Sequence, residues 1–258
     1  MNIVVCVKQV PDTESERTLR PDGTVARASA EGVIDEIDEY AIEEGLRLAE
    51  AHGGEVTILT MGPDKASESI RKALSMGADK AVHVQDEALA GSDALVTSLV
   101  LAEALKQTGF DLVILGSEST DARTGMVAAM LVERLGVPQL TLASKVDIDG
   151  TAITVRRVTD EGYQVVTAQL PAVVSVMEKI NEPRYPSFKG IMAAKKKPVE
   201  VLSVADAGID PAQVGLGAAA TEVVSFSKRP PREAGTIVKD EGDGGVKAAE
   251  FLAAQKFV

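Results

Sequence analysis

The sequence predicts an α/β fold, in which a parallel sheet is extended by antiparallel strands and followed by a C-terminal arm. Three observations predict it. Short runs of β-branched residues alternate with longer helical patterns up to Gly136. After Pro138 the spacing changes to that of β-hairpins. From Asn181 onward regular patterns become scarce, and glycine and proline become frequent.

Four apolar runs predict the buried strands of the parallel sheet, at residues 3–7, 56–59, 80–84 and 112–115. Helical periodicity follows each run, at residues 35–51, 64–75, 92–106 and 123–135. A glycine ends each helical pattern, at Gly53, Gly77, Gly109 and Gly136. Because ligands bind such sheets beyond the carboxyl ends of the strands, we expect the functional site in the loops that follow them.

The second half of the chain predicts a different architecture. Residues 140–148 and 151–158 predict a hairpin with a type I′ turn at Asp149-Gly150, and further strands are predicted at residues 163–170 and 172–177. The tail holds one helical pattern, at residues 246–257. We therefore expect three parts. They are a sheet domain with its antiparallel extension (1–180), a partner-recognition loop (181–198) and an extended C-terminal arm ending in a helix (199–258).

Composition and charge exclude several classes of function. The 258 residues carry 39 acidic and 27 basic side chains, a formal net charge of −12, which argues against nucleic-acid binding. One cysteine and two histidines are too few for a disulfide or a metal site rich in these residues. No apolar run approaches the roughly 20 residues of a membrane span, and the first residues lack the basic start of a signal peptide. We expect a cytoplasmic protein without membrane insertion.

The loop from Gly116 to Gly125 is the strongest candidate for a ligand site. It lies between the fourth predicted strand and a helix, and it offers hydroxyl groups, backbone amides and a helix N-terminus. These groups together suit a phosphate. The alternative is a capped loop, in which Asp121 only satisfies the first turn of the helix. The spacing matches neither a Walker A loop nor a GxGxxG fingerprint.

Acidic residues crowd the N-terminus of the first predicted helix, namely Asp35, Glu36, Asp38 and Glu39. Acids complement the helix dipole there, which is the structural interpretation, and a ribose-binding carboxylate is the functional alternative. Cys6, in the first strand, is interpreted as a buried and inert thiol. Neither His52 nor His83 has a catalytic partner in the sequence, so both are interpreted as structural.

Residues 181–198 indicate a docking site for another protein. Proline and glycine punctuate the stretch, and its apolar residues precede a basic run. Exposed apolar side chains with a basic rim are typical of a protein interface. The side chains concerned are Tyr185, Phe188, Ile191, Met192, Lys195, Lys196 and Lys197.

The same stretch resembles the recognition loop of the β subunit of electron-transfer flavoprotein (ETF). The match lies in NEPRY at residues 181–185 and in IMAAKKK at residues 191–197. The resemblance covers nearly the whole chain. Its further matches are residues 7–12, residues 70–80, Arg157, Asp160-Glu161-Gly162, Gln164, Pro171, Val173 and Val174.

The resemblance implies a Rossmann-like adenine-nucleotide-binding fold. It also implies a heterodimer with an ETF alpha subunit, which holds most of the contacts to one shared FAD. Members of this family take electrons from acyl-CoA dehydrogenases and related dehydrogenases, as in fatty acid oxidation. They pass these electrons to an ETF-quinone oxidoreductase, and the flavin does the chemistry without catalytic side chains from this subunit. By the same resemblance, Phe188 is the apolar anchor that enters a pocket on the dehydrogenase.

A structural AMP bound by this subunit is also implied. By the resemblance its contacts fall at Cys6, Asp35, Glu36, Ile37, Asp38, Met61, Gly116, Ser117, Ser119, Asp121, Ala122, Arg123 and Thr124. Arg123 and Thr124, at the predicted start of a helix, are the best placed of these to hold the phosphate. Three alternatives stay open: a bifurcating ETF with a second FAD in place of AMP, an adenine-nucleotide-binding sensor of the same fold, and a purely structural interaction protein.

Overall fold

The computed structural model describes residues 1–16, 18–231, 235 and 237–257. It divides into two compact units, Met1–Val224 and Ser225–Val258. In its described residues the second unit carries one helix, α6 (Gly244–Ala254), close to the helix predicted there. None of the helices in the described part of the chain has the length and apolar character needed to cross a membrane.

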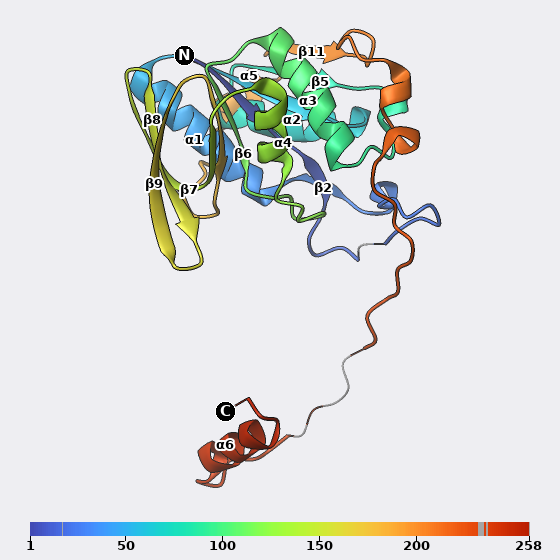
Figure 1. The fold of residues 1–258 in the computed structure, drawn as a ribbon, viewed down its shortest axis with the longest axis vertical. Coiled ribbons are helices and arrows are strands. Elements are labelled where there is room, and N and C mark those ends of the chain that lie inside the picture. Colours follow the sequence, from blue (N-terminus) through green and yellow to red (C-terminus); the bar gives the residue numbers. More distant parts are fainter. Residues whose placement is uncertain (17, 232–234, 236, 258) are drawn as a thin grey trace. The chain divides into compact units, whose positions relative to one another are not determined.

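A nine-stranded sheet forms the centre of the first unit (Figure 1). In spatial order its strands are β11 (Val199–Leu202), β5 (Lys80–Val84), β4 (Glu55–Met61), β1 (Asn2–Cys6), β6 (Leu112–Gly116), β10 (Ala172–Val176), β7 (Gln139–Asp149), β8 (Ala152–Thr159) and β9 (Gly162–Gln169). Neighbours from β11 to β7 pair in parallel. β8 and β9 add antiparallel pairs. The predicted α/β fold with an antiparallel extension is confirmed.

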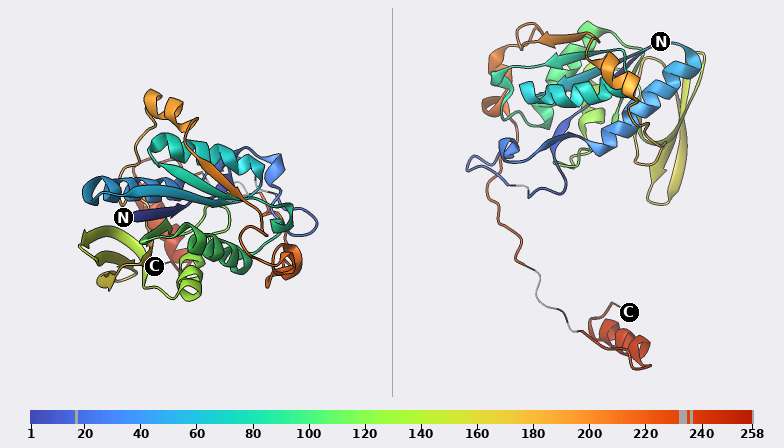
Figure 2. Two further views of the ribbon diagram at one scale, coloured as in Figure 1. Left: turned by 90° about the horizontal axis from the view of Figure 1, so that it is seen from above. Right: turned by 180° about the vertical axis from the view of Figure 1, so that it is seen from behind.

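Helices cover both faces of this sheet (Figure 2). They are α1 (Glu36–His52) and α2 (Ser67–Met76) on one face, and α3 (Ala94–Thr108) and α4 (Val127–Leu135) on the other. Ile3 and Val5 of β1 pack with the α1 and α2 side chains, whereas Val4 and Cys6 pack with those of α3 and α4. Successive residues of a strand point to opposite faces, so a strand buried on both faces is apolar throughout.

The helices that connect the parallel strands change from one face of the sheet to the other at β1. α1 and α2 follow β1 and β4 on one face, whereas α3 and α4 precede and follow β6 on the other, and β1 lies between β4 and β6. Open α/β sheets commonly bind ligands at such a reversal, outside the carboxyl ends of the strands. A small antiparallel sheet, β2 (Gln9–Pro11) and β3 (Gly32–Ile34), lies in the long connection between β1 and α1. The sequence did not predict this small sheet.

The predicted type I′ turn at Asp149-Gly150 is wrong. Asp149 pairs with Ala152, so the two turn residues are Gly150 and Thr151. Of these two, only Gly150 has a positive φ, 59°. A type I′ turn requires a positive φ at both central residues, so this hairpin uses a different turn, with glycine at the first central position.

The expected start of the C-terminal arm, at residue 199, also differs from the structure. β11 extends the parallel sheet, and the residues after it stay on the first unit, which ends at Val224. Val204, Ile209 and Val214 are buried in the core on the α3 face. Their spacing follows neither a strand nor a helix period, which explains why the sequence did not reveal this packing.

Candidate functional site

The carboxyl ends of three parallel strands meet the first turn of α1. Cys6 ends β1, Met61 ends β4 and Gly116 ends β6. The backbone amide of Gly116 donates a hydrogen bond to Asp38 Oδ1 at 3.3 Å, and a Cβ atom at Gly116 would lie 2.8 Å from Ile37 Cγ2. The predicted cofactor residues at these strand ends and at α1 therefore gather at one edge of the sheet.

Asp35 joins α1 to the loop that follows β6. Its Oδ1 accepts the amide of Ile37 at 3.1 Å, which makes it the N-cap of α1. Its Oδ2 accepts the amide of Thr120 at 2.8 Å and the Thr120 hydroxyl at 3.2 Å. Burial raises the pKa of this fully buried carboxyl group. The neighbouring Glu36 is exposed to solvent.

Asp38 joins α1 to β1 and β6. Its Oδ2 accepts the backbone amide of Lys8 at 2.7 Å, opposite the Gly116 contact to Oδ1. Burial, and then the charge of Asp35, raise the pKa of Asp38 to about 8. Burial also raises the pKa of the Cys6 thiol to about 12, so this thiol is not a thiolate at neutral pH.

Two cations converge on Asp121 at the same edge. Lys8 Nζ lies 2.6 Å from Asp121 Oδ1, and Arg27 Nη2 lies 2.7 Å from Asp121 Oδ2. Lys8 Nζ also donates to the Ser119 hydroxyl at 3.1 Å. Although burial alone would raise the pKa of Asp121, the two cations lower it to about 2. The site thus offers paired positive charges held by one carboxylate.

Lys8 and Arg27 were not among the site residues predicted from the sequence. Lys8 comes two residues after the end of β1, and that position at the carboxyl edge is a signal that would have found it. Arg27 lies in a short 3-10 turn, Arg27–Ser29, in the connection between β2 and β3. No local pattern marks Arg27, because its role depends on a partner 94 residues away.

The prediction that Arg123 and Thr124 begin a helix is wrong. α4 begins at Val127, and Arg123 has a φ of 49° while Gly125 has a φ of 64°. These left-handed residues prevent the helix from extending backward. Ala122, Arg123 and Thr124 are exposed, and Arg123 Nη1 lies 2.7 Å from Glu118 Oε1. The first turn of α4 therefore contains neither Arg123 nor Thr124.

The residues at this edge have the charge and the hydroxyl groups that suit a phosphate-bearing ligand. Lys8 and Arg27 supply charge for a phosphate. Ser117 and Ser119 are half-buried hydroxyl residues of the loop after β6, and Ser119 accepts a hydrogen bond from Lys8 Nζ. The Thr60 hydroxyl, next to the end of β4, is buried and has no hydrogen-bond partner among the described residues. In the described part of the chain no cluster of histidine, cysteine and carboxylate side chains could hold a metal ion.

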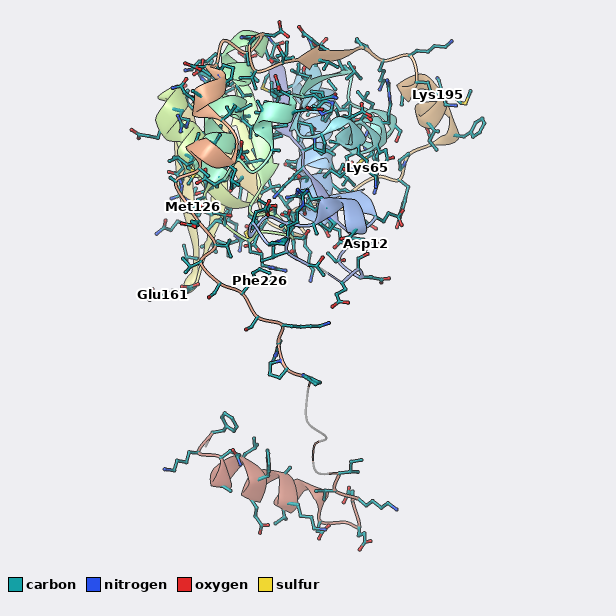
Figure 3. The ribbon with its side chains drawn as sticks, turned by 90° about the vertical axis from the view of Figure 1, so that its right-hand side faces the viewer. Asp12, Lys65, Met126, Glu161, Lys195 and Phe226 are labelled. Atoms are coloured by element: carbon teal, nitrogen blue, oxygen red, sulfur yellow. The ribbon has the colours of Figure 1, made fainter. Side chains whose placement is uncertain are left out.

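The predicted docking residues lie on a short helix, α5 (Phe188–Ala194), and beside it. The exposed fractions are 95% for Tyr185, 80% for Phe188, 46% for Ile191 and 50% for Met192. Lys195 (labelled in Figure 3) and Lys196 are also exposed at the end of α5. Lys197 differs, because its ammonium group donates to the carbonyl oxygens of Leu74, Gly77 and Ala78.

The sequence is similar to one protein family and to several named proteins. A family model described as "Electron transfer flavoprotein domain" matches residues 22–207. The chain is 53% identical over its whole length to the electron transfer flavoprotein subunit beta of Mycobacterium bovis, of which it covers 99%. It is 36% identical to the protein of the same name from Megasphaera elsdenii, with full coverage of both chains. Over 91% of the chain it is 37% identical to the "Caffeyl-CoA reductase-Etf complex subunit CarD" of Acetobacterium woodii, of which 90% is covered.

Proposed function

The chain belongs to the electron transfer flavoprotein family as a beta subunit, and on that premise we propose that it relays electrons as half of a heterodimer with an alpha subunit. The heterodimer takes electrons from acyl-CoA dehydrogenases and related dehydrogenases in the cytoplasm. It delivers them to an ETF-quinone oxidoreductase. The observation that carries this proposal is the exposed apolar surface of α5.

α5 presents a docking surface of the kind that a transient electron-transfer complex needs. Phe188, the first residue of the helix, is 80% exposed, and Ile191 and Met192 are about half exposed one turn later. The Ser187 hydroxyl accepts the amide of Gly190 at 3.0 Å and caps the helix. A large apolar side chain that is buried only in the complex can dominate the affinity of an interface.

The edge of the sheet described above is proposed to hold AMP. Lys8 and Arg27 would bind its phosphate, while Asp35 and Asp38 keep the first turn of α1 against the ends of β1 and β6. FAD, when it is bound in the heterodimer, supplies the redox chemistry. This chain positions the bound cofactors, supplies charge near them and shields them from water.

We propose that no side chain of this subunit acts as a catalyst. Burial raises the pKa of the Cys6 thiol to about 12, which removes it as a nucleophile. His83 is buried, its Nε2 lies 3.1 Å from the carbonyl oxygen of Gly62, and burial lowers its pKa. A neutral, enclosed imidazole suits a structural role in β5.

The nucleotide content of the purified heterodimer tests the cofactor assignment. Denaturation and chromatography of the released nucleotides should give one FAD and one AMP per heterodimer. Two FAD and no AMP would contradict the proposal and support the alternative of a bifurcating type with a second FAD in place of AMP.

Phe188→Ala tests the docking assignment. We expect the KM of an acyl-CoA dehydrogenase for the heterodimer to rise about tenfold, with FAD and AMP content unchanged. Leu95→Ala is the matched control, because Leu95 is an exposed leucine of α3, on the face of the sheet opposite to α2 and α5. Equal KM values for wild type and Phe188→Ala would overturn the docking role of α5.

A further inference from the structure

We propose that Lys197 and Arg71 are positioning residues that hold α5 on α2 in the orientation that docks a dehydrogenase. This inference rests on the proposed function of α5. α5 has seven residues, of which only Ala194 is buried. An isolated helix of this length is not stable in water, so contacts with the rest of the molecule must maintain it.

Lys197 binds the C-terminal end of α2. Its Nζ lies 3.0 Å from the carbonyl oxygen of Leu74, 3.1 Å from that of Gly77 and 2.6 Å from that of Ala78. An ammonium group has three donors, and here each has a carbonyl acceptor. The last carbonyls of a helix lack partners within the helix and carry the negative end of its dipole, so a cation stabilises them.

Arg71 makes the reciprocal contact from α2 to α5. Its Nη1 donates to the carbonyl oxygen of Ala194, the last residue of α5, at 2.8 Å. Each helix thus receives a cation from the other segment at its C-terminal end. The two backbones also approach closely, because a Cβ atom at Gly190 would lie 2.4 Å from the carbonyl oxygen of Ser75.

Arg184 fixes the chain just before α5. Its Nε and Nη2 lie 2.7 Å and 3.0 Å from the two carboxylate oxygens of Glu43, and its Nη1 lies 2.6 Å from Glu50 Oε1. Both glutamates belong to α1. Residues 184 and 197 are therefore bound to the two helices of one face of the sheet, and the docking side chains lie between them.

The three consecutive lysines consequently have two different roles. Lys195 and Lys196 are exposed, and within the described residues their ammonium groups make no ion pair. They can act as the charged rim of the docking surface. The Lys197 ammonium group faces the end of α2, so it holds α5 in place and does not add charge to the docking surface. A docking helix that is ordered before the encounter avoids the entropic cost of ordering it in the complex.

Lys197→Met in the purified heterodimer tests the inference, because it removes the three donors and keeps an apolar stem. Two measurements are needed: hydrogen exchange of the α5 amides, and the steady-state constants for reduction by an acyl-CoA dehydrogenase. We expect α5 amides to exchange about tenfold faster. We expect the KM for the heterodimer to rise about fivefold with kcat unchanged, and Lys197→Arg to restore much of both.

Lys72→Met is the matched control. Lys72 is a cation of α2 beside Arg71, but its ammonium group pairs with Glu39 of α1. The exchange of α5 and the KM should stay at their wild-type values in this variant. If Lys197→Met fails to assemble, Arg71→Gln removes the reciprocal contact from the other helix and must give the same two changes.

The outcomes separate this inference from the docking proposal. If Phe188→Ala raises the KM but Lys197→Met and Arg71→Gln match Lys72→Met, the positioning role is overturned and docking stands. If Phe188→Ala leaves the KM unchanged, the docking function itself is overturned. Faster exchange of α5 without any change in KM would also overturn the positioning role.

Discussion

The Lys8 ammonium nitrogen lies 2.6 Å from the Oδ1 oxygen of Asp121, although 113 residues separate them in the chain. The contact joins the segment that leaves β1 to the loop that leaves β6. The Asp121 side chain is 1% exposed and receives Arg27 on its other oxygen. The carboxylate therefore keeps two cations together at the edge where an anionic ligand would bind.

Lys8→Met should weaken the retention of AMP. Loss of one charge-assisted hydrogen bond costs about 1.5–3 kcal/mol, which corresponds to at least a tenfold weaker affinity. The purified heterodimer should then contain less than one AMP per FAD. Lys65→Met serves as the control, because Lys65 is an exposed lysine of the turn after β4 (labelled in Figure 3). Full AMP occupancy in Lys8→Met would show that this cation does not bind the nucleotide.

Asp38 should make the stability of the protein fall as the pH rises. Its pKa is raised from 3.8 to about 8 in the folded protein, so the folded state keeps a proton that the unfolded chain releases. The contribution of Asp38 to the stability is therefore fully present below about pH 4 and is lost between about pH 4 and pH 8, by on the order of 1 kcal/mol per pH unit. Asp38→Asn should remove this decline. The Tm of Asp38→Asn minus that of the wild type should therefore increase as the pH is raised from 5 to 8.

Asp121→Asn is the control for this experiment, because its pKa is shifted in the opposite direction. Asp121 has a pKa lowered to about 2 and is ionised throughout the range from pH 5 to pH 8. Its contribution is lost only as the pH falls below about 4. The Tm difference between Asp121→Asn and wild type should stay constant over the measured range. A Tm difference for Asp38→Asn that is equally constant would refute the raised pKa.

Gly116→Ala should destabilise the site through a steric clash. The added Cβ atom would lie 2.8 Å from both Asp38 Oδ1 and Ile37 Cγ2. Overpacking of a buried position costs about 1–3 kcal/mol, and here it also displaces the first turn of α1. We expect a lower Tm and reduced AMP content. Gly217→Ala, at a glycine with open space around it, should change neither quantity.

Ending the chain after Val224 should abolish assembly with the alpha subunit while the first unit stays folded. In the second unit α6 buries none of its residues, and Phe226, Phe251 and Phe257 are each more than half exposed. Apolar surface of this kind is typical of a segment that is covered by a partner. Circular dichroism should retain the α/β spectrum, and co-purification should be lost. A 1:1 complex formed by the shortened chain would contradict this prediction, and a chain that ends after Ala254 keeps α6 as the control.

Local patterns predicted the α/β fold class, the four central parallel strands and part of the candidate site. The apolar runs predicted β1, β4, β5 and β6 to within two residues at each end, because strands buried on both faces must be apolar throughout. The acidic cluster at Asp35 and Asp38 was predicted at the start of α1, where a side-chain cap is required. The exposure expected of Phe188 also agrees with the structure.

The tertiary structure alone decided which charges act together. Arg27 reaches Asp121 across 94 residues, and Lys197 reaches the end of α2 across more than 100. The sequence pattern predicted Arg123 in a helix. Arg123 and Gly125 instead have left-handed backbone conformations, so α4 begins only at Val127. Periodicity and capping depend on residues that are close together in the chain, and they were enough to predict most helices and strands of this protein. The partners of Lys8, Arg27 and Lys197 depend on how those elements pack, because hydrogen bonds between distant segments leave no period in the sequence.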